Sequence, residues 1–110
     1  MAYEGPFIPA YGNGVTITTS GTSQNVTIQK GTLSVRIQNT SATNGCFVRV
    51  FNSQNNPTSP ASSTSPTADV YIGPNSYMTL GKGREDDTVS VIQAAGTAVL
   101  WIIPGEGGLL

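Results

Sequence analysis

Alternation of apolar and polar residues is the feature of this sequence that most constrains its fold. The segments "GVTITTS", "NVTIQKG", "LSVRIQN" and "CFVRVFN", all within residues 14–52, place every second side chain on an apolar face. Many of the apolar residues are β-branched. Successive side chains of an extended strand point to opposite faces, so this period predicts strands that each lay one face on a core.

The second half of the chain repeats the pattern. "ADVYIG" and "SYMTLG" flank the turn Gly73-Pro74-Asn75, and "TVSVIQA" and "AVLWII" flank Ala95-Gly96-Thr97, which has the composition of a hairpin loop. No window places apolar residues at helical spacing. We therefore expect an all-β fold, an antiparallel β-sandwich of jelly-roll-like form with about eight short strands and essentially no helix.

The last strand is apolar on both faces. Val99, Trp101 and Ile103 share one face, and Leu100 and Ile102 share the other. Such a strand is either central in the sandwich or buried against another subunit, and we expect the first. Trp101 is accordingly expected to pack in the core.

The 110 residues have the length of one domain. We expect residues 1–14 to form an extended N-terminal arm. Its aromatic and apolar side chains need a surface to lie on, either that of their own domain or that of a neighbour. We expect residues 15–110 to form a single β-sandwich domain, with a long, uncharged polar loop at 53–68. The arm's candidate partner contacts are Tyr3, Phe7, Ile8 and Tyr11.

The composition argues against several classes of function. Five basic and six acidic residues leave a net charge of −1, which gives no electrostatic attraction to nucleic acid or to a membrane surface. The chain has no histidine, the commonest general base and metal ligand. We expect no catalysis, cofactor or metal site, and no membrane or nucleic-acid partner. The single cysteine, Cys46, lies in a predicted strand and is expected to be a small buried apolar side chain.

One short segment, "GKGREDD" at 81–87, holds five of the eleven charged side chains. It lacks the spacing of a phosphate loop and of a calcium loop. The glycines can form a turn that the charges keep soluble, or the charges can form ion pairs with a partner. The candidate contacts are Lys82, Arg84, Glu85, Asp86 and Asp87.

Three parts of the sequence resemble a recurrent pattern in small structural proteins of tailed bacteriophages. They are "SVRIQNT…FVRVFNS", "ADVYIGPNSYMTLG" and "DTVSVIQAAGTAVLWIIPGEG", of which "GTAVLWIIPGEG" is the most specific. The similarity runs from about Val15 to Gly107. It includes the capsid decoration, or cement, proteins of short-tailed phages, although the long loop at 53–68 and the aromatic arm depart from the pattern.

The resemblance implies a virion structural protein on the capsid surface, made in the host cytoplasm, that binds the major capsid protein and stabilises the head. It also implies a homo-oligomer, a dimer or trimer, and supplies no catalytic residue. A head-fibre, tail or baseplate component is the alternative for the same fold. A carbohydrate-binding β-sandwich module is a third, with Tyr71, Tyr77 or Trp101 as stacking platforms.

Overall fold

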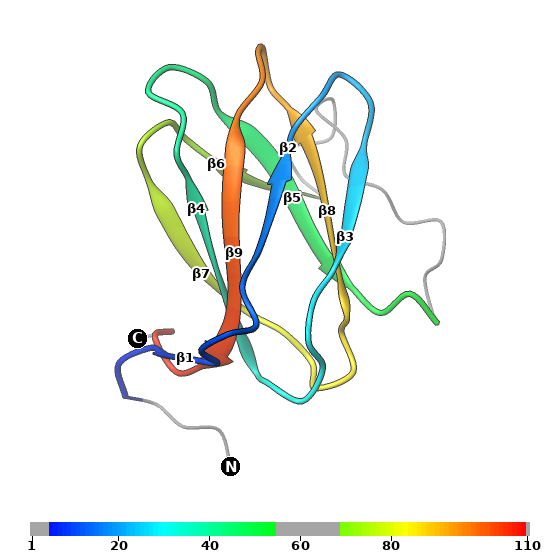
Figure 1. The fold of residues 1–110 in the computed structure, drawn as a ribbon, viewed down its shortest axis with the longest axis vertical. Helices are drawn as coiled ribbons and strands as arrows, with labels where there is room; N and C mark the ends of the chain where they lie inside the picture. Colours follow the sequence, from blue (N-terminus) through cyan, green and yellow to red (C-terminus); the bar gives the residue numbers. More distant parts are fainter. Residues whose placement is uncertain (1–4, 55–68, 110) are drawn as a thin grey trace.

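The computed structural model describes residues 5–54 and 69–109, which form two stacked antiparallel sheets (Figure 1). Sheet A contains β1 (Ile8–Pro9), β2 (Val15–Thr18), β9 (Val99–Glu106), β4 (Ser34–Asn39) and β7 (Tyr77–Gly81). Sheet B contains β3 (Gln24–Thr27), β8 (Thr88–Gln93), β5 (Cys46–Phe51) and β6 (Val70–Ile72). The described residues include no helix, and so none long and apolar enough to cross a membrane.

The strand order is that of a jelly roll. Strands β2, β9, β4 and β7 follow one another in this order across sheet A, and strands β3, β8, β5 and β6 follow one another in this order across sheet B. The predicted antiparallel β-sandwich of jelly-roll-like form is therefore confirmed. The short β1 is a ninth strand in addition to these eight, and it pairs with the C-terminal half of β9.

Most of the connections run between the sheets. β8 pairs with β3 and β5, whereas β9 pairs with β2 and β4, so the segment Ala95-Gly96-Thr97 crosses from sheet B to sheet A. The predicted hairpin loop at this position is wrong. A turn composition marks a reversal of the chain, but it does not tell whether the next strand pairs with the previous one or with the opposite sheet.

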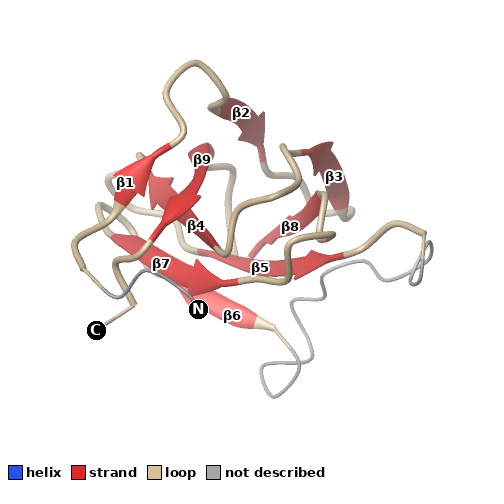
Figure 2. Cartoon of the chain, turned by 90° about the horizontal axis from the view of Figure 1, so that it is seen from below, coloured by secondary structure: helices blue, strands red, loops and turns tan. Residues whose placement is uncertain are grey.

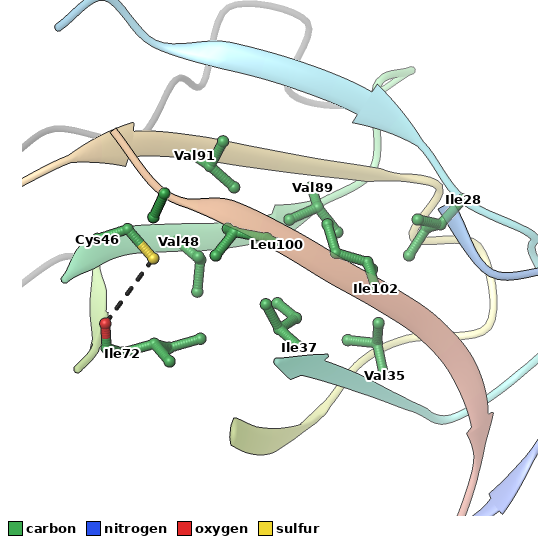
Figure 3. Close-up of a cluster of buried hydrophobic side chains, with 11 residues drawn as sticks. Ile28, Val35, Ile37, Cys46, Val48, Ile72, Val89, Val91, Leu100 and Ile102 are labelled. Carbon is green, nitrogen blue, oxygen red and sulfur yellow. Dashed lines mark hydrogen bonds between the residues drawn. The ribbon is translucent and has the colours of Figure 1, made fainter. Parts of the chain in front are cut away.

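The core lies between the sheets and consists of inward-facing residues of the alternating pattern (Figure 3). Val35, Ile37, Val48, Val89 and Leu100 are fully buried there. Cys46 belongs to the same cluster, as predicted, and its Sγ lies 3.8 Å from the carbonyl oxygen of Ile72. Burial raises the pKa of the Cys46 thiol to about 11, so the thiol is protonated and unreactive at neutral pH.

One buried polar residue joins the two sheets. Asn39 ends β4, and its Nδ2 donates to the carbonyl oxygens of Asn44, at 2.8 Å, and Ile72, at 3.3 Å. Its Oδ1 accepts from the N–H of Ser41 at 2.9 Å. Because every polar group of this side chain is satisfied, its burial costs little and fixes the position of β6 relative to β4.

Candidate functional site

The described part of the N-terminal arm, the described residues that follow β9 and the charged turn 81–87 lie at one end of the sandwich, which we call the basal end (Figures 1 and 2). The arm enters this end as a strand. Ile8 and Pro9 pair with Glu106 and Gly105, and the N–H of Ala10 donates to the carbonyl oxygen of Pro104 at 2.8 Å. The described part of the arm therefore packs on its own domain, which was one of the two expected arrangements.

Phe7 anchors the arm. A Cβ added to Gly105 would lie 2.7 Å from the Phe7 ring, and one added to Gly108 would lie 2.8 Å from the Phe7 Cβ. The ring thus occupies space that only glycine leaves free. The guanidinium of Arg36 also stacks on the ring, with Cζ 4.6 Å from the centroid.

The arm also presents side chains to solvent. Ile8 is 51% exposed, and Tyr11, in the turn between β1 and β2, is 81% exposed. Leu109, close to the C-terminus, is 48% exposed. Phe7 is partly buried and so offers a partner less surface than Ile8 and Tyr11, while Tyr3 lies outside the described residues.

The charged turn is held together by its own side chains. Lys82 is only 8% exposed, and its Nζ donates to the carbonyl oxygens of Gly83, at 3.0 Å, and Asp86, at 2.9 Å. The carboxylate of Asp86 accepts from the N–H of Gly83 at 2.9 Å. Burial lowers the pKa of the Lys82 ammonium from its usual range, although the carboxylates of Asp86 and Glu106 oppose this shift.

The remaining charges of this turn attach it to neighbouring segments. Arg84 Nη1 donates to the carbonyl oxygen of Gly31 at 2.7 Å. Asp87 accepts from the N–H and Oγ of Ser53, at 3.0 and 2.9 Å, and from Thr88 Oγ1 at 2.9 Å. The N–H of Ser53, with these hydroxyl donors, lowers the pKa of Asp87 from its usual value of 3.8.

Four of the five charges therefore shape the turn, whereas Glu85 is exposed and makes no hydrogen bond described within residues 5–54 and 69–109. Arg84 is also exposed. Contact of this turn with a partner stays a prediction, which rests chiefly on these two residues. In the described part of the chain, no three His, Cys, Asp or Glu side chains gather into a group that could hold a metal ion.

A second candidate surface lies on the outer face of sheet A. The register aligns Thr16 of β2, Trp101 of β9, Gln38 of β4 and Tyr77 of β7 in one line across four strands. Directly opposed residues of antiparallel strands share a face, so these four side chains form a row, which we call the aromatic row. Trp101 is 54% exposed and Tyr77 is 61% exposed.

The expected burial of Trp101 in the core is therefore wrong. β9 is central within its sheet, as expected, with β2 on one side and β4 on the other. A central strand still has two faces, and the side chains that point between the sheets are those with the parity of Leu100 and Ile102, including Pro104. Val99 and Trp101 have the opposite parity and point outward, where the described residues leave them exposed.

Arg36 lies next to the aromatic row, two residues from Gln38 on the same face of β4. Its Cζ lies 4.6 Å from the ring centroid of Tyr77 as well as from that of Phe7, and its Nε donates to Thr79 Oγ1 at 3.0 Å. A groove with a volume of about 750 Å³ borders the row and is lined by Trp101, Gln38, Arg36 and Thr16 among other residues. The sequence showed the parity of each strand but not which strands pair, so Arg36 and Gln38 were not recognised as site residues.

No protein-family model and no curated protein matches this chain. Among solved structures, it resembles a de novo designed double-stranded β-helix, with 14% identity and a TM-score of 0.47, over 84% of this chain and 97% of that one. PirA has 11% identity and a TM-score of 0.48, over 86% and 94%. A structure of Bacillus endospore appendages, described as a novel family of disulfide-linked pili, has 12% identity and a TM-score of 0.45, over 97% and 95%. At these identities none of the three assigns a function to the chain.

Proposed function

We propose that this protein is a non-catalytic structural component of a phage particle that binds the capsid exterior through its basal end and stabilises the head. The observation that carries the proposal is the position of Ile8, Tyr11 and Leu109. These exposed residues belong to β1, to the turn that follows it and to the C-terminal segment, which lie at the same end of the jelly roll as the charged turn (Figure 1). The sequence resemblance to decoration proteins supports the same role.

The basal end has the composition of a protein-binding surface. Tyrosine and large apolar residues are enriched at the centre of protein interfaces, and charged residues lie at the rim. Here Ile8, Tyr11 and Leu109 supply apolar contact, and the exposed Arg84 and Glu85 supply charges that fix orientation. The partner is the major capsid protein. Many copies of this chain on one shell, as dimers or trimers, make weak individual contacts effective.

The test is binding of purified protein to expanded, undecorated capsids, measured by co-sedimentation. We expect saturable binding at a fixed ratio to the capsid subunit. The double variant Ile8→Ala, Tyr11→Ala should bind at least about tenfold more weakly, because a buried tyrosine commonly contributes this much. These variants are preferable to deletion of the arm, which would remove β1 and uncover part of sheet A.

Tyr71→Ala is the matched control. Tyr71 is 50% exposed but lies on sheet B, where its ring packs against Phe47 with the centroids 5.4 Å apart. This variant should bind capsids like the unmodified protein. Absence of saturable binding would refute the proposal. Location of the protein in the tail, baseplate or head fibres of intact particles by cryo-microscopy would support the alternative virion role.

A further inference from the structure

The aromatic row is separate from the residues assigned to capsid binding and has a ligand chemistry of its own. Trp101 and Tyr77 lie on strands that flank β4, so their backbones are about 9.5 Å apart, which is twice the usual spacing of neighbouring strands. Both side chains project from strands, which are rigid elements, and both are more than half exposed. Two aromatic side chains therefore project from one surface, attached at a fixed backbone spacing.

The groups between and beside the rings are polar and uncharged. Gln38 separates Trp101 from Tyr77, and Thr16 follows on the other side of Trp101. Gln38 is exposed, and its side-chain amide makes no hydrogen bond described within residues 5–54 and 69–109. It can donate and accept at once, as the amide carries two donors and a carbonyl acceptor.

The charge of this face points to a neutral ligand. Arg36 is the only charged side chain among the described outward-facing positions of β2, β4, β7 and β9. Its guanidinium is already placed between the rings of Phe7 and Tyr77 and donates to Thr79. This arrangement restrains the Tyr77 ring before any ligand arrives, which lowers the entropic cost of binding.

We propose that the aromatic row binds a neutral saccharide chain. Pyranose rings present C–H groups with a slight positive charge on their faces, and these are attracted to the negative face of an aromatic ring. Hydroxyl groups at the edges of the sugar rings exchange hydrogen bonds with the Gln38 amide and the Thr16 hydroxyl. Trp101 and Tyr77 thus stack on two sugar rings of one chain, and the Gln38 amide hydrogen-bonds to hydroxyl groups between them.

A second copy of this protein is the competing occupant of this face. In an isologous contact the Gln38 amide would meet only the polar side chains of the same row on the other copy, Gln38 and Thr16, whereas a sugar chain offers hydroxyl groups along its whole length. A sugar chain satisfies the same amide with its hydroxyl groups. The saccharide is therefore the occupant that matches both the aromatic and the polar members of the row.

Trp101 is the single tryptophan of the chain, so intrinsic fluorescence reports directly on this site. The experiment titrates the protein with cellohexaose, maltohexaose, xylohexaose, mannohexaose and chitohexaose. At least one of them should change the emission of Trp101 in a saturable way. Isothermal titration calorimetry with the same oligosaccharide should give the same dissociation constant.

Variants separate stacking from nonspecific effects. Trp101→Ala and Tyr77→Leu should each weaken binding at least about tenfold. Binding to Trp101→Ala is measured by calorimetry, because this variant has no tryptophan. Tyr77→Phe, which keeps the ring, should bind nearly as well as the unmodified protein. Tyr11→Ala is the matched control, because its tyrosine is exposed at the basal end, and it should leave saccharide binding unchanged. Trp101→Ala should in turn leave capsid binding unchanged, so this proposal and the proposed function stand or fall separately.

Three outcomes would overturn the inference. The first is no response to any of the five oligosaccharides up to roughly 10 mM, beyond which affinity is negligible. The second is binding only of an anionic oligosaccharide, such as oligogalacturonate, that disappears at high salt, which would show charge attraction to Arg36 in place of stacking. The third is self-association in analytical ultracentrifugation that is lost in Trp101→Ala, which would show that a second copy occupies the face.

Discussion

The guanidinium of Arg36 lies on the ring of Tyr77, with Cζ 4.6 Å from the ring centroid. The same cation stacks on Phe7 at the same distance and so connects the anchored arm with the aromatic row. One side chain of β4 therefore couples the two surfaces to which we assign binding. A change in the docking of the arm is expected to alter the restraint on Tyr77.

Replacement of Arg36 by alanine tests this coupling. Arg36→Ala removes two cation–π contacts and the hydrogen bond to Thr79, and should lower the free energy of unfolding by about 1–2 kcal/mol. Urea unfolding measures this change, and Lys30→Ala, at an exposed turn position, serves as the control. Saccharide binding should also weaken, because Tyr77 loses its restraint. Unchanged stability would show that the stacking contributes nothing.

Asp87 should make stability depend on pH. Its pKa is lowered in the folded protein, so the carboxylate stabilises the fold at pH values above the unfolded pKa. This stabilisation is lost as the pH falls below about 4 and through the lowered folded pKa. Asp87→Asn should be less stable by about 1 kcal/mol at neutral pH, a value reduced for solvent screening, and should lose less stability on acidification.

Glu85→Gln is the control for this experiment, since it removes a carboxylate from the same turn without removing a described hydrogen bond. Urea unfolding of both variants should be compared at acid and neutral pH. Equal pH dependence in Asp87→Asn and the unmodified protein would contradict the assignment.

Gly105 should be intolerant of any side chain. An added Cβ would collide with the carbonyl oxygen of Ile8 and with the Phe7 ring, so Gly105→Ala should displace the arm and cost about 1–3 kcal/mol. Faster proteolysis near residues 5–10, followed by mass spectrometry, would report the displacement. Gly14→Ala is the matched control, because its nearest contact would be an ordinary 3.6 Å. If both variants are cleaved alike, Phe7 does not hold the arm.

Cys46 should serve as a reporter of unfolding. The thiol is fully buried and burial raises its pKa to about 11, so it ionises and becomes accessible to a thiol reagent only when the sandwich opens. The labelling rate should follow the opening of the fold and increase steeply with urea. Rapid stoichiometric labelling of the native protein at neutral pH would contradict its position in the core.

Arm and turn show the limits of local sequence patterns for the candidate sites. The prolines and aromatics of residues 5–11 indicated an extended segment, but not that glycines near residue 105 leave room for Phe7. The charges of 81–87 indicated a turn, but not that Lys82 hydrogen-bonds to backbone carbonyls of the turn and that Asp87 accepts from the N–H of Ser53. Both depend on residues that are distant in sequence.

The residues alone predict the eight longer strands, the parity of their side chains and the burial of Cys46, because alternation along a strand is a local property of extended backbone. They do not predict which strands pair. Jelly-roll connections carry the chain from one sheet to the other, so the neighbours of β9 come from residues 15–18 and 34–39. Only that pairing brings Trp101, Gln38 and Tyr77 into one row and leaves the tryptophan outside the core, since the sandwich buries one face of each strand.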